Sequence, residues 1–449
     1  MASRRPTPLS GFPELLPGQR IVEAQVIRTL SEIFELHGFA PLETRAVEPL
    51  DQLLRKGETS KEVYVLRRLQ AEGDEDAGLG LHFDLTVPFA RYVLENAGKL
   101  EFPFRRYQVQ KVWRGERPQE GRFREFTQAD IDVVGRDTLP FHHDVEVARV
   151  MVDALRRLEF LPPLRLQVNN RKLIQGFYSG LGADDVDEVM RVVDKLDKVS
   201  TDEVRRMLVD EAGLDDKQAE LCLRLAAISS SDLAFVDDVR ALGVEHPLLE
   251  EGLTELAAVV EGCAPLVDDR VRIVADLTIA RGLDYYTGTV FETRLEGYEW
   301  LGSICSGGRY DALASDGKAT YPGVGISLGL SRLLVPLFQR GVLTADRSVP
   351  SAVLVALPDE DSRAASDAVA QRLRARGIAT EVAAAPQKYG KQIRYAERRG
   401  IPFVWFPAGD DGTHEVKDIR SGDQQPADPE TWSPPAEDLR PTMVRQEET

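Results

Sequence analysis

Apolar residues recur at nearly every third position between residues 19 and 39, at Ile21, Ala24, Ile27, Leu30, Ile33 and Leu36. This period predicts an amphipathic helix that ends at Gly38, followed by a strand over residues 39–43. Between residues 80 and 135 the pattern changes to β-rich segments separated by polar turns, which predicts antiparallel strands. These segments read LGLHFDLTVPF, FRRYQVQKVWRG and FREFTQADIDVVG.

The second part of the chain is expected to leave this sheet and return to it. Residues 141–160 have helical spacing, LRLQVNN reads as a strand, and residues 171–268 are rich in Asp, Glu, Leu and Ala at helical intervals. We interpret this region as a helical insertion with little strand character. Strands are then expected at VRIVADL, DYYTGTVFETRL and SICSGGRYDAL, and a closing helix begins in GVGISLGLSRLLVPLF.

The C-terminal part alternates between the two periods, which is typical of a small α/β domain. We expect a strand at AVLVALP, a helix through Ala365, Val369 and Leu373, a strand at IATEVA, a helix at KQIRYAERRG and a strand at IPFVWF. The last residues mix proline with acidic side chains, which predicts a loosely ordered tail. The expected divisions of this α+β chain are 1–170, 171–268, 269–347, 348–422 and 423–449.

Composition narrows the possible functions. The chain has 449 residues, 43% of them hydrophobic, and only three cysteines, Cys222, Cys263 and Cys305, whose spacing fits neither a disulfide framework nor a zinc site. No apolar segment follows the basic start, and no stretch approaches the ~20 apolar residues that cross a bilayer. We therefore expect a cytoplasmic location and no membrane partner. Because the formal charge is −18, any contact with nucleic acid must be local, at basic stretches such as 105–124 or 388–399.

Charged residues converge around one predicted turn, in VWRGERPQEGRFREFTQADIDVVG. Arg114 and Glu116 precede this turn, and Arg122 and Arg124 follow it. An exposed, charge-balanced hairpin would have the same composition. In the next strand, however, Gln128, Asp130 and Asp132 alternate, so their side chains share one face. Because buried carboxylates need partners, this row favours a polar pocket.

Three further stretches carry polar groups among apolar neighbours. In ADLTIARGLDYYTGTVFE, Arg281, Asp284, Tyr285 and Tyr286 are embedded in strand-like sequence, although Arg281 and Asp284 would also fit a purely structural ion pair. CSGGRYDAL and GVGISLGLSRL combine glycines, which allow close backbone approach, with Arg332 in the first turns of the closing helix. In LGLHFDLTVPFARY we expect Asp84 and Thr86 to alternate along a strand.

These stretches, in this order, resemble the histidyl-tRNA synthetase family. RGLDYYTGTVFE and GGRYD resemble its two histidine signatures, RGERPQEGRFREFTQ resembles motif 2 of the class II synthetases, and GISLGLSRLL resembles motif 3. The resemblance covers nearly the whole chain. It implies a class II antiparallel-sheet catalytic core with a helical insertion, an anticodon-binding α/β domain, and a homodimer. It also implies ATP-dependent activation of L-histidine and its transfer to the 3′ end of tRNA(His).

The resemblance assigns the phosphates of ATP to arginines. Arg114 would contact the α-phosphate, Arg122 and Arg332 the β and γ end, and Glu116 the adenine amino group, with Mg²⁺ bridging the phosphates. Arg281 would lie across the α-phosphate from Arg114, so that Arg281 and Arg114 are the expected catalytic residues. No metal ligand is expected among the side chains.

The histidine site is implied in the same way. Asp132 and Tyr286 would hold the imidazole ring, Asp84, Thr86 and Gln128 would hold the α-amino group, and Arg281 and Tyr285 complete the expected set. Basic residues near one C-terminal helix would hold the anticodon stem and loop of tRNA, with Arg399 beside the principal set of Lys388, Lys391, Arg394 and Arg398. Removing the residues after about 348 would then spare adenylate formation and weaken tRNA charging.

Two departures from the family pattern stand out. Ala46 replaces a proline that is common in motif 1, which bears on the dimer contact, and Ser331 replaces a glutamate that commonly precedes the motif 3 arginine. A histidine-sensing regulatory paralogue without catalytic activity is the main alternative. Such paralogues tend to lose the phosphate-binding arginines and the RNA-binding domain, and both are present here. A class II synthetase for another amino acid is a second alternative.

Overall fold

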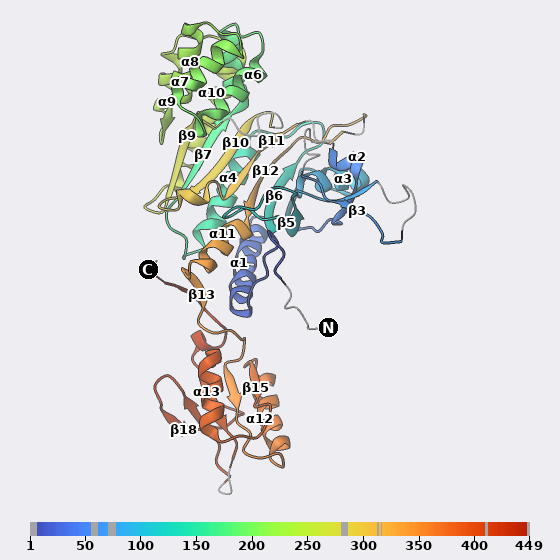
Figure 1. The fold of residues 1–449 in the computed structure, drawn as a ribbon, viewed down its shortest axis with the longest axis vertical. Coiled ribbons are helices and arrows are strands. Elements are labelled where there is room, and N and C mark those ends of the chain that lie inside the picture. The colour runs from blue at the N-terminus through green and yellow to red at the C-terminus, as the bar shows by residue number, and fades with distance from the viewer. Residues whose placement is uncertain are drawn as a thin grey trace. The chain divides into compact units, whose positions relative to one another are not determined.

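The computed structural model describes residues 7–54, 62–70, 78–279, 286–311, 314–315, 317–408 and 412–446. Of the predicted site residues, Arg281 and Tyr285 lie outside these ranges, as does Asp284. The chain divides into two compact units (Figure 1). The larger unit comprises Met1–Pro13 and Ile27–Pro336, and the smaller unit comprises Glu14–Val26 and Leu337–Thr449.

A nine-stranded sheet forms the centre of the larger unit (Figure 1). Its central run from β5 to β7 is antiparallel, whereas β1 pairs with β5 and β9 with β7 in parallel. In spatial order the strands are β1 (Ala40–Pro41), β5 (Phe104–Trp113), β6 (Glu125–Val134), β12 (Gly323–Gly329), β11 (Cys305–Tyr310), β10 (Thr289–Leu295), β7 (Leu164–Asn170), β9 (Val271–Asp276) and β8 (Ser229–Ser230). The predicted antiparallel core is confirmed.

Helices α4 (His142–Arg156) and α10 (Pro247–Cys263) pack against each other and against the sheet. The apolar positions of α4, including Val147, Met151 and Ala154, are buried, as their helical spacing predicts. Helix α11 (Leu330–Gln339) follows β12 directly, so that Arg332 lies in its first turn. Helix α1 (Pro17–Leu36) ends close to the predicted position.

A helical insertion lies between β7 and β9, as the fold class predicts. Five of its helices begin at capping side chains that accept backbone N–H groups: Asn170, Asp185, Ser200, Asp215 and His246. Its helices before α10 are α5 (Arg171–Gly180), α6 (Val186–Val193), α7 (Thr201–Asp210), α8 (Asp216–Ala226) and α9 (Ala234–Arg240). The short strand β8 lies within this region and extends the sheet edge beside β9. It has two residues, too few to produce the alternating apolar pattern that predicts a strand.

The prediction of a strand carrying Asp84 and Thr86 is wrong. Strand β4 (Leu79–Leu81) ends before Asp84, and Thr86 begins helix α3 (Thr86–Asn96). The Asp84 carboxylate accepts a hydrogen bond from the Val87 N–H at 3.0 Å. Pro88 needs no N–H partner in a first helical turn. Asp84, which accepts a backbone N–H of the first turn, and Pro88 within that turn therefore mark the start of a helix here. The alternation of polar residues had resembled a strand.

Strand β4 belongs instead to a separate three-stranded sheet with β2 (Val47–Pro49) and β3 (Val65–Leu66). The segment that resembles motif 1 contributes β2 and the short helix α2 (Leu50–Leu53). Ala46 accepts the His82 N–H through its carbonyl at 3.0 Å.

The smaller unit has the predicted α/β pattern around a five-stranded sheet. Its order is β15 (Thr380–Val382), β14 (Val353–Val355), β16 (Phe403–Phe406), β17 (Glu415–Asp418) and β18 (Gln424–Pro426). Helices α12 (Arg363–Ala375) and α13 (Tyr389–Arg399) connect the parallel strands. Two apolar clusters, centred on Val353 with Val355 and on Leu354 with Val404, form its core.

The prediction of a loosely ordered tail after residue 423 needs correction. Strand β18 completes the five-stranded sheet, and β19 (Met443–Arg445) pairs antiparallel with β13 (Leu343–Ala345). Between them, Trp432 packs edge-on against Phe403 and Trp405, with ring centroids 5.3 and 5.5 Å away. Proline-rich, acidic composition indicated disorder, but one tryptophan with a buried partner surface is enough to anchor such a segment.

Candidate active site

A cavity of about 210 Å³ lies on the central sheet of the larger unit. It is bordered by β6, β11, β12 and the first turn of α11, and by the turn that joins β5 to β6. Its lining residues are Arg114, Glu116, Gly121, Arg122, Phe123, Phe126, Gln128, Ser303, Ile304, Ser306, Ser327, Gly329 and Arg332. Three of the four arginines that the family resemblance assigns to the phosphates of ATP therefore meet around one cavity, with Glu116 and Gln128.

Backbone carbonyls hold two of these arginines in place. Arg114 donates from Nε to the Phe83 carbonyl at 3.0 Å, and its guanidinium carbon lies 5.2 Å from the Phe126 ring centroid. Arg332 donates from Nε to the Leu301 carbonyl at 2.8 Å. Gly302 adopts a φ of +65°, and a Cβ there would lie 2.7 Å from Arg332 Nη2. The backbone conformation therefore favours glycine here, and the absence of a side chain leaves room for the Arg332 guanidinium.

Carboxylates balance part of this positive charge. Arg122 Nη1 lies 4.0 Å from Glu116 Oε2. Burial raises the pKa of Glu62 above its usual range, while the positive charge of Arg114 opposes this and the neighbouring Glu116 reinforces it. Glu62 was not singled out from the sequence, because it lies far from the motif and approaches it only in the folded chain, where its carbonyl accepts the Gly115 N–H at 2.7 Å.

A buried polar cluster lies on β5, β6, β11 and β12. Arg106 pairs with Asp132 at 2.7 Å, and Tyr310 donates its hydroxyl to Asp132 Oδ1 at 2.7 Å. Arg106 is completely buried and lies over the Phe89 ring at 4.4 Å. A Cβ on Gly325 would meet Asp132 Oδ1 at 2.2 Å, so the glycine leaves room for the carboxylate. The predicted polar face of β6 is thus a partnered ionic cluster.

Gln128 connects the arginine-lined cavity to Asp130, which lies two residues before Asp132 on β6. It lines the cavity and donates from Nε2 to Ser327 Oγ at 2.7 Å, and Ser327 in turn hydrogen-bonds Asp130. The Gln128 Oε1 atom is buried without a hydrogen-bond partner. Because an unpaired buried acceptor is costly, this oxygen is suited to receive a donor from a ligand.

Asp130 has an unusual protonation equilibrium. Burial raises the pKa of its carboxyl to about 7, with Arg106 opposing the rise and Asp132 reinforcing it. A carboxyl with a raised pKa favours the folded state while protonated. Its contribution is complete below the unfolded pKa of 3.8 and is lost as the pH rises to about 7.

Substituting Asp130→Asn is therefore expected to become increasingly stabilising, relative to the unsubstituted protein, as the pH rises. The amide keeps an acceptor for Ser327 but never ionises. Between about pH 5 and pH 8 we expect the difference in unfolding free energy to grow by roughly 2–3 kcal/mol. Urea denaturation at both pH values measures it. The exposed Asp238 provides the control, since the effect of Asp238→Asn on the unfolding free energy should not change between the two pH values. An effect of Asp130→Asn that is also the same at both pH values would contradict the prediction.

Two further histidine-site candidates, Asp84 and Tyr286, lie near this cluster. Burial raises the pKa of the Tyr286 hydroxyl, and the nearby charges of Asp132, Asp84 and Asp130 raise it further. Thr86 is half-buried at the start of α3. Arg106 and Tyr310 were missed in the sequence. Strand register would have revealed Arg106, because it stands directly opposite Asp132 on β5 and β6.

Ser331 has a structural role where the family pattern has a glutamate. Its Oγ accepts the Thr127 N–H at 2.9 Å, which ties the start of α11 to β6. The departure thus retains an acceptor at this point, one residue before Arg332.

Within the described ranges, no group of three or more His, Cys, Asp or Glu side chains is arranged to hold a metal ion. Nor does any helix there combine the length and apolarity that a bilayer-spanning helix needs.

In the smaller unit, the predicted basic residues share the solvent-exposed side of one element. Lys391, Arg394 and Arg398 are exposed on α13, and Lys388 is exposed immediately before it. The neighbouring Arg399 is engaged differently, since it donates to the Tyr395 hydroxyl at 2.7 Å.

Comparison with solved structures and curated proteins agrees with this architecture. The chain superposes on the crystal structure of histidyl-tRNA synthetase from Nostoc sp. PCC 7120 with a TM-score of 0.84 and 34% identity, covering 95% of this chain and 97% of that one. The fold and the arginine-lined cavity define a class II aminoacyl-tRNA synthetase.

The family follows from sequence matches over most of the chain. Residues 11–333 match the family model of histidyl-tRNA synthetase, and residues 351–431 match an anticodon binding domain. A histidine–tRNA ligase of Cutibacterium acnes is 60% identical, with 97% of this chain and 98% of the relative covered, and one of Micrococcus luteus is 58% identical, with 99% and 100% covered. The chain belongs to the histidyl-tRNA synthetase family.

Proposed function

We propose that this chain activates L-histidine with ATP to form histidyl-adenylate and pyrophosphate, and then transfers the histidyl group to the 3′ end of tRNA(His). The observation that carries the proposal is the meeting of Arg114, Arg122 and Arg332 around one cavity. Hydrogen bonds from Gln128 through Ser327 connect this cavity to Asp130, two residues from Asp132 on β6. The arginines supply positive charge for the triphosphate of ATP, and the polar cluster supplies hydrogen-bond partners for the imidazole nitrogens.

In the first step a histidine carboxylate oxygen attacks the α-phosphorus, and the bond from that phosphorus to the pyrophosphate oxygen breaks. No general base is needed, because the carboxylate is already ionised at neutral pH. Charge accumulates on the phosphoryl oxygens and on the departing pyrophosphate, so the protein's contribution is positioned positive charge. Arg114 serves the α-phosphate, Arg122 and Arg332 serve the β and γ end, and Arg281 acts opposite Arg114.

Substrate recognition uses the polar groups beside these arginines. Glu116 accepts the adenine amino group, and ATP enters as its Mg²⁺ complex. Asp132 and Tyr286 bind the imidazole nitrogens, while Asp84, Thr86 and Gln128 bind the α-amino group; Arg281 and Tyr285 complete the histidine site. A site built to pair both ring nitrogens rejects amino acids that lack them by ~10⁴ or more, because its own polar groups would stay unpaired.

The remaining assignments concern partners and location. Lys388, Lys391, Arg394 and Arg398 contact tRNA phosphates, which supply affinity and not sequence specificity. The active species is a cytoplasmic homodimer.

Pyrophosphate exchange with each of the twenty amino acids tests the proposal. We expect exchange to depend on histidine alone. Exchange supported by another amino acid would assign the chain to that substrate. Histidine binding without any exchange would favour a regulatory paralogue, although the retained arginines and the second unit argue against this alternative.

A further inference from the structure

We infer that Arg309 is a positioning residue that holds the Tyr286–Thr287 turn against the histidine site, so that histidine affinity depends on a side chain lying on the opposite face of the sheet. The inference rests on the proposed function, because it deepens the account of the same site.

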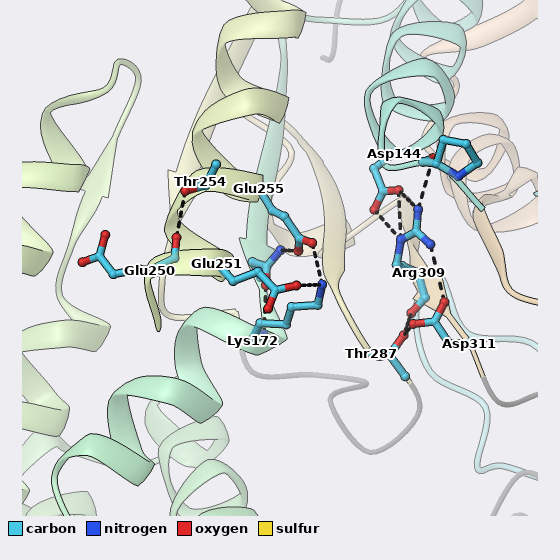
Figure 2. A network of polar contacts seen from close by, with 11 residues as sticks. Asp144, Lys172, Glu250, Glu251, Thr254, Glu255, Thr287, Arg309 and Asp311 are labelled. Carbon is cyan, nitrogen blue, oxygen red and sulfur yellow. Dashed lines mark hydrogen bonds and ion pairs between the residues drawn. The ribbon is translucent and has the colours of Figure 1, made fainter. Parts of the chain in front are cut away.

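The Arg309 side chain is enclosed by protein groups (Figure 2). Its Nε lies 3.1 Å and its Nη2 2.6 Å from Asp144 Oδ2, and Nη2 also reaches the Pro140 carbonyl at 3.5 Å. Its Nη1 lies 3.4 Å from Asp311 Oδ1. Every guanidinium nitrogen therefore has a protein partner, and the side chain acts through these partners.

The same arginine is coupled to the turn before β10. The Thr287 N–H donates to the Arg309 carbonyl at 2.8 Å, and the Thr287 hydroxyl donates to Asp311 Oδ2 at 2.5 Å (Figure 2). The Asp311 carboxylate thus accepts hydrogen bonds from both Arg309 and Thr287. On the other side of the turn, the Gly288 carbonyl accepts the Arg171 N–H at 2.8 Å, and a Cβ on Gly288 would lie 3.0 Å from Arg309 Cδ. The turn is held from two sides.

Strand alternation connects this anchor to the histidine site. Side chains of neighbouring strand residues point to opposite faces, so Arg309 faces helix α4 while Gly308 and Tyr310 face the other way. A Cβ on Gly308 would lie 2.7 Å from Tyr286 Cδ1, which means that the tyrosine ring rests on Gly308. Tyr310 donates to Asp132. One short segment of β11 thereby anchors the turn on one face and supports Tyr286 and Asp132 on the other.

The choice of variants follows from the burial of Asp144, which is completely inaccessible. Removing the arginine charge would leave a buried carboxylate without compensation and would destabilise the whole unit. Arg309→Lys keeps the charge, but an ammonium cannot reach Asp144 and Asp311 with the fixed fork of a guanidinium. Thr287→Val is nearly isosteric and removes only the hydrogen bonds of the hydroxyl, to Asp311 and, at 3.4 Å, to the Arg309 carbonyl.

Steady-state pyrophosphate exchange by the full chain tests the inference. Both Arg309→Lys and Thr287→Val are expected to raise KM for histidine, Arg309→Lys by about tenfold, with KM for ATP changing less than about twofold. Because both substitutions act through one turn, the double variant should show less than the product of the two single effects.

The other cluster in Figure 2 offers a matched control. Lys172 bridges Glu251 at 2.7 Å and Glu255 at 2.5 Å between α5 and α10, so it also joins a cation to two carboxylates. The hydrogen bonds that the structure shows for its side chain are to α10 and not to Thr287 or Asp311, and the substitution leaves the backbone N–H of Arg171 in place. Lys172→Gln should leave KM for histidine unchanged.

The outcomes separate the inference from the proposed function. If the unsubstituted protein shows no histidine-dependent exchange, the proposed function fails. If it exchanges normally, the inference is overturned by any of three results. Arg309→Lys and Thr287→Val change KM for histidine and KM for ATP equally, or they change neither KM. Alternatively, the KM increase for histidine in the double variant equals the product of the two single increases, which would mean that Arg309 and Thr287 act independently.

Discussion

Substituting Arg114→Gln is expected to lower the rate of histidine-dependent pyrophosphate exchange about a thousandfold. Arg114 lines the cavity with Arg122 and Arg332, and its Nε is already committed to the Phe83 carbonyl. Two unit charges ~4 Å apart interact by ~1 kcal/mol in water but by ~4 kcal/mol at an effective dielectric near 20. A half-buried arginine beside a transferring phosphoryl group therefore contributes several times what the same charge contributes in water.

The control for this variant is Arg105→Gln. Arg105 lies on β5, near the other end of the strand that leads to Arg114, and pairs with Glu146 at 2.9 Å outside the cavity. It should exchange within about twofold of the unsubstituted protein, because surface ion pairs of this kind contribute little. An Arg114→Gln protein with unchanged thermal stability and near-normal exchange would remove Arg114 from the mechanism.

Removing the four basic side chains of the α13 surface is expected to weaken tRNA charging about a hundredfold at moderate salt while leaving pyrophosphate exchange intact. The substitutions are Lys388→Ala, Lys391→Ala, Arg394→Ala and Arg398→Ala. Each lost phosphate contact also lowers the dependence of binding on salt, because fewer counterions are released. KM for tRNA(His) measured at several salt concentrations therefore gives a second readout, and its salt slope should become shallower.

A control with the same charge change removes four exposed basic side chains from the larger unit, namely Arg28, Lys99, Arg136 and Arg157. It separates local contacts from the overall increase in negative charge. Equal loss of charging in both variants would show that net charge, and not the α13 surface, sets tRNA affinity.

These substitutions are preferable to the deletion after residue 348 that the sequence suggested. Strand β19 pairs with β13, which lies before that point, and Thr442 hydrogen-bonds Asp346 at 2.9 Å. The deletion would leave β13 without its partner, so any loss of charging would combine lost RNA contacts with lost structure.

Elements with a long, single periodicity were predictable. Strands β5 and β6, helix α4 and the alternating C-terminal unit follow their apolar patterns, because burial of one face decides each of them. Asp84 and Thr86 were misassigned because their alternation spans too few residues to distinguish a strand from a capped helix start. The tail was misassigned because composition carries no information about the surface that buries Trp432.

The candidate site was predictable where one motif supplies several residues. Arg114, Glu116 and Arg122 lie on one turn, so local sequence brings them together. Arg106 and Tyr310 reach Asp132 from separate strands, and only the register of β5, β6, β12 and β11 aligns them. Periodicity identifies which face a side chain occupies, but the register between distant strands depends on the assembled sheet.

The β13–β19 pairing also constrains how the smaller unit is made. About a hundred residues separate the two strands, and a ribosome adding roughly 5–20 residues per second needs about 5–20 seconds to synthesise them. Throughout that interval the nascent β13 exposes unsatisfied backbone donors and acceptors, which is the kind of edge that recruits foreign strands. Premature termination shortly before Met443 would make this exposure permanent, so prematurely terminated polypeptides should aggregate more readily than those extended past Arg445.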